Sequence, residues 1–399
     1  MSSRTPLLAV LIVLSFFAGI TGVHLAYTLA YALLLLLAVA FIWSAVLVRR
    51  LEVRRYPPEG AHMVGEAFAE RFTLRNRSIL TLPYCEVHDR SAIPGYAPGR
   101  ACALNPGGAV AWIARGVFTQ RGKLAFGPLE VRLGDPFGLW PRTVRIKETG
   151  SVTIYPAIHA VDGVLGPVWV GGSFGEARHG RGLDVPPDIS SVREHSPDDG
   201  LSRIHWPSTA RAGRMMSRLY ESRQSSDVMV LLDLSRGSHF GDPPESTLEY
   251  AVSLAASICH AALARGQAVG LVTNDRVATA IGPGRGEAQR FRILEFLATA
   301  QANGRRSISA TIEQHGRGWQ GRGGLIVITS DRDPDWVETL VEAGARGQRH
   351  LAVMVDPTSF GAPGSPMRVS AAWRLALDWW IVRRGDVLSA PRHTRAAGM

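Results

Sequence analysis

Two aspartates stand at the ends of apolar runs, where side chains often bind a metal ion or a ligand. Asp233 directly follows the run 228–232, and Asp331 comes shortly after the run 325–328. Short apolar runs bounded by polar residues predict buried strands. In a doubly wound sheet with strand order 3-2-1-4-5-6, the first and fourth strands are neighbours and their carboxyl ends line a ligand crevice. We therefore expect the two carboxylates to share one crevice.

The residue types at this crevice suit a hard divalent cation. Asp233, Ser235 and Asp331 supply carboxylate and hydroxyl oxygens, and Mg²⁺ prefers oxygen ligands in octahedral geometry while keeping several waters. The alternative is that both aspartates cap helices or accept hydrogen bonds from loop amides. The sequence leaves a metal site and a purely structural role both open.

The same residues resemble the metal-ion-dependent adhesion site of von Willebrand factor A domains. The first motif of that site is D-x-S-x-S, and its later ligands are a Thr and an Asp. Asp233 and Ser235 match the first two places, and Asp331 matches the last Asp. Gly237 occupies the place of the second serine, with Ser238 beside it as a substitute, and no residue is assigned to the Thr ligand. The resemblance implies a Rossmann-type α/β domain that binds a protein partner, whose carboxylate completes the coordination of Mg²⁺.

A polar loop before these strands is the second candidate site. It holds Arg193, Glu194, His195, Asp198, Asp199, Arg203, His205, Trp206 and Arg211. A histidine oriented by an aspartate is a common general base, so a hydrolase or transferase that uses the loop from His195 to His205 is one hypothesis. No nucleophile elbow, phosphate-binding glycine loop or H-E-x-x-H motif accompanies the loop. We therefore favour a network of ion pairs and stacked side chains, with no catalytic residue and no enzyme activity.

The elements that must position these residues belong to a chain of several domains. Residues 49–158 carry short alternating runs separated by turns, which predicts an antiparallel β-sandwich. Residues 159–226 are rich in Gly, Pro and Arg and are interpreted as a connecting region that contains the polar loop. Residues 227–385 alternate buried strands with helical patterns, which predicts an α/β doubly wound domain with a mainly parallel sheet. Residues 386–399 are expected to form a flexible tail.

Specific elements are expected within the α/β domain. Its predicted strands are 228–232, 268–273, 277–281, 325–328, 351–355 and 379–382, and its predicted helices are 247–265, 287–301, 335–345 and 367–377. The second and third of these strands form an antiparallel hairpin at the edge of the sheet.

The N-terminal region predicts two transmembrane helices, within residues 1–48. Positions 5–48 form a run of 44 residues without Asp, Glu, Lys or Arg. One span needs about 20 apolar residues, so the run accommodates two, at 7–23 and 25–48. A cleaved signal peptide is the alternative, but its apolar region would be only roughly 7–15 residues long.

Positive charge sets the expected orientation and partners. Basic residues flank both ends of the predicted hairpin, at Arg4, Arg49, Arg50, Arg54 and Arg55. Basic flanks favour the cytoplasmic side, so we expect a two-pass protein of the plasma membrane with a cytoplasmic soluble body. The net charge of +10 is interpreted as a means of attracting the chain to anionic headgroups of the lipid bilayer. The arginines are scattered without a recognition motif, so no nucleic-acid partner is expected.

The three cysteines indicate neither a disulfide framework nor a zinc site. They are odd in number and widely spaced, without a C-x-x-C pair, at Cys85, Cys102 and Cys259. Such cysteines are interpreted as buried thiols.

Several segments taken in order resemble the bacterial family known as domain of unknown function 58. They are Arg115-Gly116-Val117-Phe118, Gly127-Pro128-Leu129, Asp135-Pro136-Phe137-Gly138-Leu139, Tyr155-Pro156, Val192-Arg193-Glu194-His195, Arg203-Ile204-His205-Trp206 and Ala210-Arg211. The family pattern reads Y-x-P-G-D before R-x-I-x-W. This chain departs from it with His195-Ser196-Pro197-Asp198-Asp199-Gly200.

This resemblance, which extends from the paired helices to the last strand, implies a membrane-attached protein with a von Willebrand A-like domain. Members of the family are often encoded beside MoxR-type AAA+ ATPases and transglutaminase-like proteins, and such ATPases act in maturation or metal insertion. The chain is therefore expected to be a non-enzymatic scaffold or adaptor that binds a protein partner, with a MoxR-type AAA+ ATPase as the candidate and Mg²⁺ as the candidate cofactor.

Overall fold

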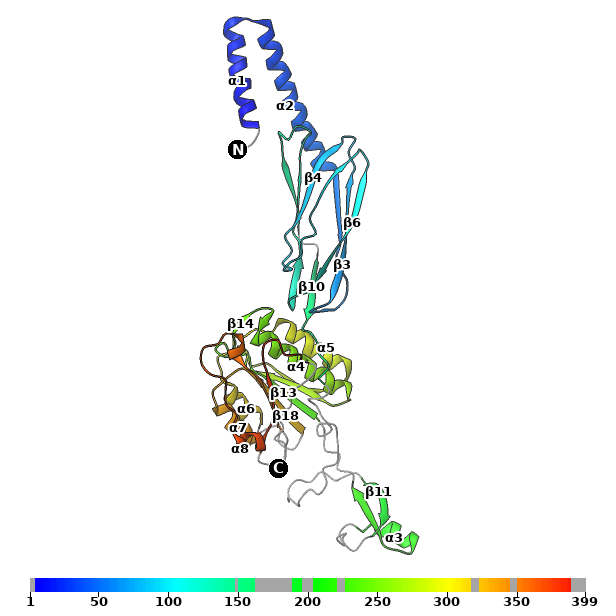
Figure 1. Cartoon of the computed structure of the whole chain (residues 1–399). Helices are drawn as coiled ribbons and strands as arrows, with labels where there is room; N and C mark the ends of the chain where they lie inside the picture. Colours follow the sequence, from blue (N-terminus) through cyan, green and yellow to red (C-terminus); the bar gives the residue numbers. More distant parts are fainter. Residues whose placement is uncertain are drawn as a thin grey trace. The chain divides into compact units, whose positions relative to one another are not determined.

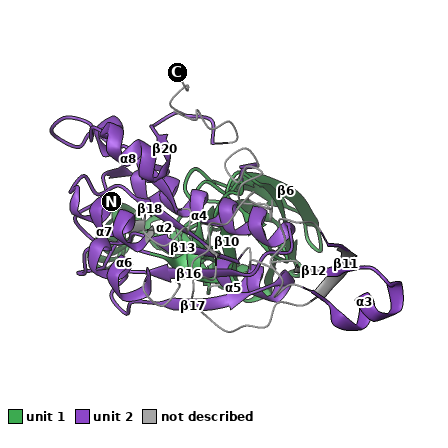
Figure 2. Cartoon of the chain, turned by 90° about the horizontal axis from the view of Figure 1, so that it is seen from below, with its two compact units in different colours: residues 1–158, 294–300 green, residues 159–293, 301–399 purple. Residues whose placement is uncertain are grey.

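The structure of the protein is a computed structural model. It describes residues 4–147, 150–161, 189–195, 204–220, 227–316, 323–344 and 350–388. The chain divides into two compact units, shown in green and purple in Figure 2. Residues 1–158 and 294–300 form the first unit, and residues 159–293 and 301–399 form the second.

The first unit begins with two apolar helices, α1 (Arg4–Thr21) and α2 (His24–Arg50), which run side by side (Figure 1). Gly22 between them has a φ of +68°, a conformation that glycine adopts without steric cost. Apolar side chains such as Ile12 and Phe16 are about 70% exposed. Helix α2 is long and apolar enough to cross a membrane. Two apolar helices near the N-terminus thus indicate membrane association, with bounds within three residues of the expected ones.

Ten strands follow α2 among the described residues of the first unit. They are β1 (Leu51–Tyr56), β2 (His62–Met63), β3 (Ala67–Asn76), β4 (Leu82–Asp89), β5 (Arg100–Leu104), β6 (Ala109–Val117), β7 (Gly122–Phe126), β8 (Leu129–Leu133), β9 (Arg142–Ile146) and β10 (Gly150–Tyr155). They form three sheets, with the orders β1-β3-β6, β2-β10-β7 and β5-β4-β8-β9. Buried and exposed residues alternate along β3, and Phe72 and Leu74 from its buried face pack with Cys85 and Val131 of the four-stranded sheet.

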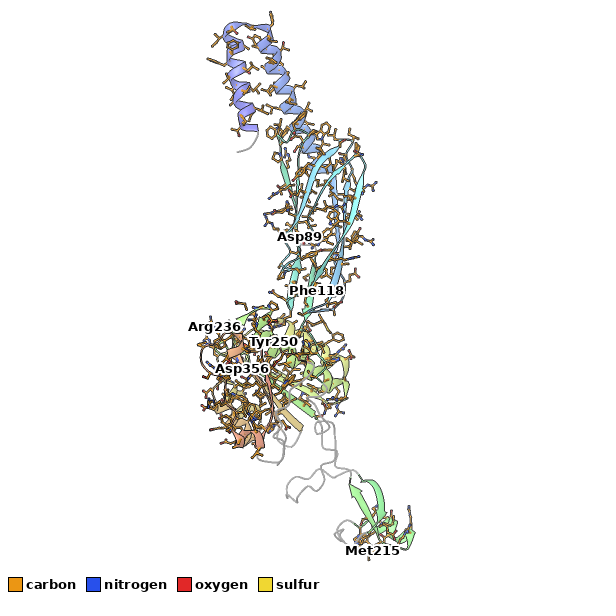
Figure 3. The ribbon with its side chains drawn as sticks, in the orientation of Figure 1. Asp89, Phe118, Met215, Arg236, Tyr250 and Asp356 are labelled. Carbon is orange, nitrogen blue, oxygen red and sulfur yellow. The ribbon has the colours of Figure 1, made fainter. Side chains whose placement is uncertain are left out.

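A buried charge network also stabilises the first unit. The Arg55 guanidinium donates to the Glu70 carboxylate at 2.9 Å and to the Asp89 carboxylate at 3.0 Å. The side chains of all three residues are at most 1% exposed. Tyr96 donates its hydroxyl to the same Glu70 carboxylate at 2.6 Å. Figure 3 labels Asp89 within this strand-rich region.

The second unit contains a six-stranded sheet in the order β17-β16-β13-β18-β19-β20. Its strands are β13 (Asp227–Leu232), β16 (Val269–Thr273), β17 (Ala280–Gly284), β18 (Gly323–Thr329), β19 (His350–Val355) and β20 (Asp378–Val382). Only the edge strand β17 pairs in the antiparallel sense. In chain order these strands follow the 3-2-1-4-5-6 pattern, so β13 and β18 are neighbours, as expected.

Helices cover both faces of this sheet. They are α4 (Thr247–Ala264), α5 (Gly286–Thr299), α6 (Ile308–Gly316), α7 (Asp335–Gly344) and α8 (Ala371–Ala376). Side chains of α6, α7 and α8 share one core with Met229 and Val327 of the central strands, whereas α4 packs on the sheet from the other side (Figure 1). Helix α4 also has the length and hydropathy of a membrane span, but 67% of that window is buried, so it is a core helix of this unit.

Several elements differ from the expected ones. Helix α6 was not predicted, and the helix expected over 367–377 contains only the six residues of α8, because Ser370 caps it by accepting the Trp373 N–H at 3.2 Å. The region predicted to be a connection holds an antiparallel pair, β11 (Ile189–Glu194) and β12 (Met216–Tyr220), with α3 (Trp206–Ala212) between the two strands. The shorter elements of the unit are β14 (Gly241–Asp242), β15 (Glu245–Ser246) and a 3₁₀ turn at Pro357–Phe360.

Candidate functional site

The candidate site lies at the carboxyl ends of β13 and β18, which pair in parallel so that Leu232 lies opposite Ile328. Asp233 follows β13 and is fully buried. Its Oδ1 accepts hydrogen bonds from the Ser235 N–H at 2.9 Å and the Ser235 hydroxyl at 2.7 Å, and its Oδ2 accepts one from the Thr329 hydroxyl at 2.7 Å. The carboxylate therefore joins the ends of two neighbouring strands.

Hydroxyl groups surround this carboxylate. The Ser238 Oγ lies 2.5 Å from the Ser235 Oγ, and Gly237 has open space where a side chain would be. Ser330 donates its hydroxyl to the Ser238 carbonyl at 2.6 Å, which ties the loop after β13 to the loop after β18. Ser238 thus lies beside Ser235, while its role as a substitute for the missing serine of the motif stays a prediction.

Three neighbours of Asp233 were not expected as site residues. Asn274, fully buried directly after β16, donates its amide to Asp233 Oδ1 at 2.8 Å. The His239 ring lies 2.9 Å from the Asp233 carbonyl. Thr329, the last residue of β18, donates its hydroxyl to Asp233 Oδ2. Asn274 and Thr329 both lie at carboxyl ends of central strands, so the strand-end rule that identified Asp233 would also have found them.

Asp331 lies at the same edge but is only partly buried. Its N–H donates to the Thr329 hydroxyl at 2.9 Å, and its carboxylate accepts the Asp333 N–H at 3.0 Å. Burial raises the pKa of Asp331 and outweighs the effect of that hydrogen bond, and the charges of Asp233 and Asp333 raise it further. Two like charges thus lie close enough to interact, an arrangement that a cation would relieve.

The donor chemistry fits a hard cation, with one restriction. All the side-chain donors are oxygen atoms, as Mg²⁺ prefers. An ionised carboxylate has about four lone-pair positions, two on each oxygen, and Asp233 Oδ1 already accepts three hydrogen bonds. Oδ2 accepts only one, from Thr329, among the described residues, so it retains a position for a cation. Across the part of the chain that the structure describes, no group of three His, Cys, Asp or Glu residues suits a metal ion.

The polar loop is described only in part, because Asp198, Asp199 and Arg203 lie outside the described residues. Its two histidines contact different serines. The Nδ1 of His195 lies 2.8 Å from the Oγ of Ser217 on β12, and the Nδ1 of His205 lies 2.7 Å from the Oγ of Ser208 in α3.

Three other described members of the loop, Glu194, Trp206 and Arg211, have exposed side chains. Glu194 forms an exposed ion pair with Arg214 at 3.1 Å, and Trp206, which begins α3, is 66% exposed. Arg211 is exposed in the last turn of α3, while Arg193 lies within β11. Figure 3 labels Met215, which directly precedes β12.

Part of the chain matches a known protein family. Residues 191–363 match the family described as "Protein of unknown function DUF58". The resemblance to DUF58 expected from the sequence is confirmed for this range. The DUF58 match begins within β11 and extends beyond β19, and it therefore contains the site around Asp233 and the whole polar loop.

Relatives of the chain carry similarly general descriptions. "Uncharacterized protein YeaD" of Bacillus subtilis is 23% identical over 354 residues, which cover 83% of this chain and 83% of that protein. "Uncharacterized protein Rv1480" of Mycobacterium tuberculosis is 25% identical over 194 residues, 46% of this chain and 61% of that protein. Among solved structures, the CARDB domain of PF1109 from Pyrococcus furiosus is 16% identical and covers 26% of this chain and 86% of that chain. Its TM-score of 0.20 carries no conclusion about the fold.

Proposed function

We propose that this chain is a membrane-anchored, non-enzymatic adaptor whose von Willebrand A-like α/β unit binds a protein partner. The observation that carries the proposal is the pair of hydroxyl groups, from Ser235 and Thr329, that both donate to the Asp233 carboxylate. Because each hydroxyl proton points at Asp233, the oxygens act as acceptors toward other groups: the Thr329 oxygen accepts the Asp331 N–H, and the Ser235 oxygen lies 2.5 Å from the Ser238 hydroxyl. Oriented hydroxyl oxygens beside a carboxylate suit a ligand-binding edge, because hard cations prefer such oxygen ligands.

In this proposal, Mg²⁺ is the candidate cofactor at the edge. Ser235, Ser238 and Asp331 would hold the ion together with Asp233 Oδ2, and the ion would supply a coordination position for a carboxylate of the partner. The interacting charges of Asp233 and Asp331 support a cation here. Gly237 contributes no ligand, and Ser238 would substitute for the serine that the motif has there, while water and the partner would occupy the remaining positions.

The proposed partner is an AAA+ ATPase of the MoxR type. The match to DUF58 supports this choice, because the family resemblance implies such a neighbour. In the proposed topology, α1 and α2 cross the plasma membrane as a hairpin, and the rest of the chain lies in the cytoplasm as a β-sandwich and the α/β unit. Arg49 and Arg50 at the end of α2 support this orientation, since basic flanks favour the cytoplasmic side. An ATP-driven partner would be accessible there.

Affinity capture from native cells tests the adaptor. The full chain, solubilised in detergent, is captured in Mg²⁺ or in EDTA, and co-purified proteins are identified by mass spectrometry. We expect an AAA+ ATPase to be recovered with wild type in Mg²⁺, and to be lost in EDTA or with Asp331→Asn. Asp333→Asn, at a nearby exposed aspartate, is the matched control and should retain the partner. If the ATPase is recovered in both buffers, the chain is an adaptor that does not need the metal. If no ATPase is recovered in either buffer, the proposal is rejected.

One contact favours an enzyme as the second candidate function. The hydrogen-bond distance between His195 and Ser217 is that of a general base and a nucleophile. However, Ser217 is only 2% exposed, so a substrate would have to displace its neighbours to reach it. We therefore expect no labelling of the wild-type protein by a fluorophosphonate probe. Labelling that disappears in Ser217→Ala would favour a hydrolase over the adaptor.

A further inference from the structure

A pocket of about 510 Å³ lies beside the Asp233 site within the α/β unit. Its lining is unusual in charge, because three arginines contribute and no acidic residue does. The lining residues are Arg236, Arg276, Ala302, Asn303, Gly304 and Arg305. Figure 3 labels Arg236 on the α/β unit.

The backbone fixes the walls of this pocket. They come from the segments that follow β13, β16 and α5. The Arg236 N–H donates to the Gly304 carbonyl at 3.1 Å, and the Gly304 N–H donates to the Leu234 carbonyl at 2.9 Å. The Arg276 N–H donates to the Asn303 side-chain oxygen at 2.9 Å. The three arginines thus extend from backbone that is held in place, although their side chains are exposed.

The guanidinium groups have capacity for a ligand. Within the described part of the chain, Arg236, Arg276 and Arg305 form no ion pair with an acidic side chain. Asp275, next to Arg276 in sequence, is occupied by hydrogen bonds from the backbone N–H and the hydroxyl of Thr279. Because the oxygen of the Asn303 side chain accepts the Arg276 N–H, its amide NH₂ group remains a further donor.

We propose that this pocket binds the phosphate groups of a small soluble molecule, of the size and charge of a diphosphate. Each guanidinium offers a planar fork of donors that matches phosphate oxygens. A single carboxylate has two oxygens and one charge, whereas a diphosphate has enough oxygens and charge for three forks. The volume lies within the range of about 300–1,000 Å³ typical of small-molecule sites. The assignment is independent of the protein partner of the adaptor.

Titration calorimetry with inorganic pyrophosphate tests the proposal, on the full chain in a phosphate-free maltoside detergent at low ionic strength. We expect one pyrophosphate per chain. Arg236→Gln, Arg276→Gln and Arg305→Gln should each weaken binding about tenfold, since each removes charge-assisted hydrogen bonds. Arg292→Gln is the matched control, because Arg292 is an exposed arginine of α5 that does not line the pocket, and it should bind as wild type does.

Three outcomes would overturn the assignment. If pyrophosphate at millimolar concentration does not bind the wild-type protein, the pocket is not a phosphate site. Equal weakening by Arg292→Gln means that the whole basic surface, rather than this pocket, attracts the anion. A hexaglutamate peptide that binds more tightly than pyrophosphate, and loses binding in the same three variants, assigns the pocket to an acidic protein segment instead. Thermal unfolding of each variant verifies that the fold is retained.

Discussion

The side-chain amide of Asn274 lies 2.8 Å from Asp233 Oδ1, so the loop after β16 holds the carboxylate that follows β13. The same amide donates to the Arg306 carbonyl at 2.9 Å, and the Asn274 oxygen accepts the Leu234 N–H at 2.5 Å. One buried side chain therefore joins three loops at the carboxyl edge of the sheet. The Asp233 site and the arginine pocket both depend on these loops.

Asn274→Ala should lower the free energy of unfolding by about 3 kcal/mol, because it leaves the Leu234 N–H and the Arg306 carbonyl without a partner. Urea unfolding followed by tryptophan fluorescence measures the change. Asn303→Ala is the control, since this exposed asparagine accepts a single hydrogen bond, and it should cost less than about 1 kcal/mol. Equal losses in the two variants would contradict the structural role of Asn274.

Gly304→Ala should also be strongly destabilising, for a steric reason. A Cβ at this position would lie 1.9 Å from the Asn274 carbonyl oxygen and 3.0 Å from the Leu234 carbonyl oxygen. Backbone has to move to relieve these contacts, and such overpacking costs about 1–3 kcal/mol or more. Thermal unfolding of the purified protein measures the loss. Gly282→Ala, where nothing lies within 4 Å, should leave the transition temperature unchanged.

The sequence predicted those elements whose apolar runs are continuous. The run 351–355 lies within β19, and the run 228–232 lies within β13. The prediction from sequence failed where contacts between residues distant in the chain determine the structure. Helix α6 is short and follows a polar stretch, and its buried Ile308 and Ile312 gain their core partners only when α7 packs beside them. In the same way, β11 and β12 consist of mixed polar residues that become strands by pairing with each other.

The sequence predicted individual residues of the candidate site, but it did not predict the contact between Asn274 and Asp233. The strand-end rule identified Asp233 and Asp331, and the motif identified Ser235. Asn274 lies 41 positions from Asp233. It also follows a predicted strand, but the sequence does not show that its side-chain amide contacts the Asp233 carboxylate. Only the order of strands in the sheet brings their ends together.

Arg55→Met should destabilise the first unit by about 3–5 kcal/mol, because Glu70 and Asp89 would remain as buried charges without their partner. The neighbouring Arg54→Met is the matched control. The Arg54 side chain is 60% exposed and pairs with Glu52 at the surface, where ion pairs contribute at most about 1 kcal/mol. Circular dichroism during thermal unfolding compares the two variants. A loss of similar size in both would mean that the buried network contributes little.

Asp331→Asn should stabilise the protein at neutral pH in the absence of divalent cations. Because burial raises the pKa of Asp331 in the folded state, folding favours its neutral form. The stabilising contribution of this group is therefore complete below the unfolded pKa and is lost as the pH rises through the folded pKa. Urea unfolding of wild type and variant from pH 3 to pH 7 should give curves that diverge as the pH rises. Curves that remain parallel would contradict the raised pKa.

Gly237→Ser should strengthen Mg²⁺ binding about tenfold if the Asp233 edge is a metal site, because it supplies the hydroxyl that the D-x-S-x-S pattern lacks. The position has no contact within 4 Å and no positive φ, so the side chain fits without strain. The measurement is the shift of the unfolding transition with added Mg²⁺, since a ligand stabilises the folded state that binds it. Gly237→Ala adds the Cβ without the hydroxyl and should behave as wild type. A Mg²⁺ response that is equal in the serine and alanine variants would place the ion elsewhere, because only the serine oxygen distinguishes the two.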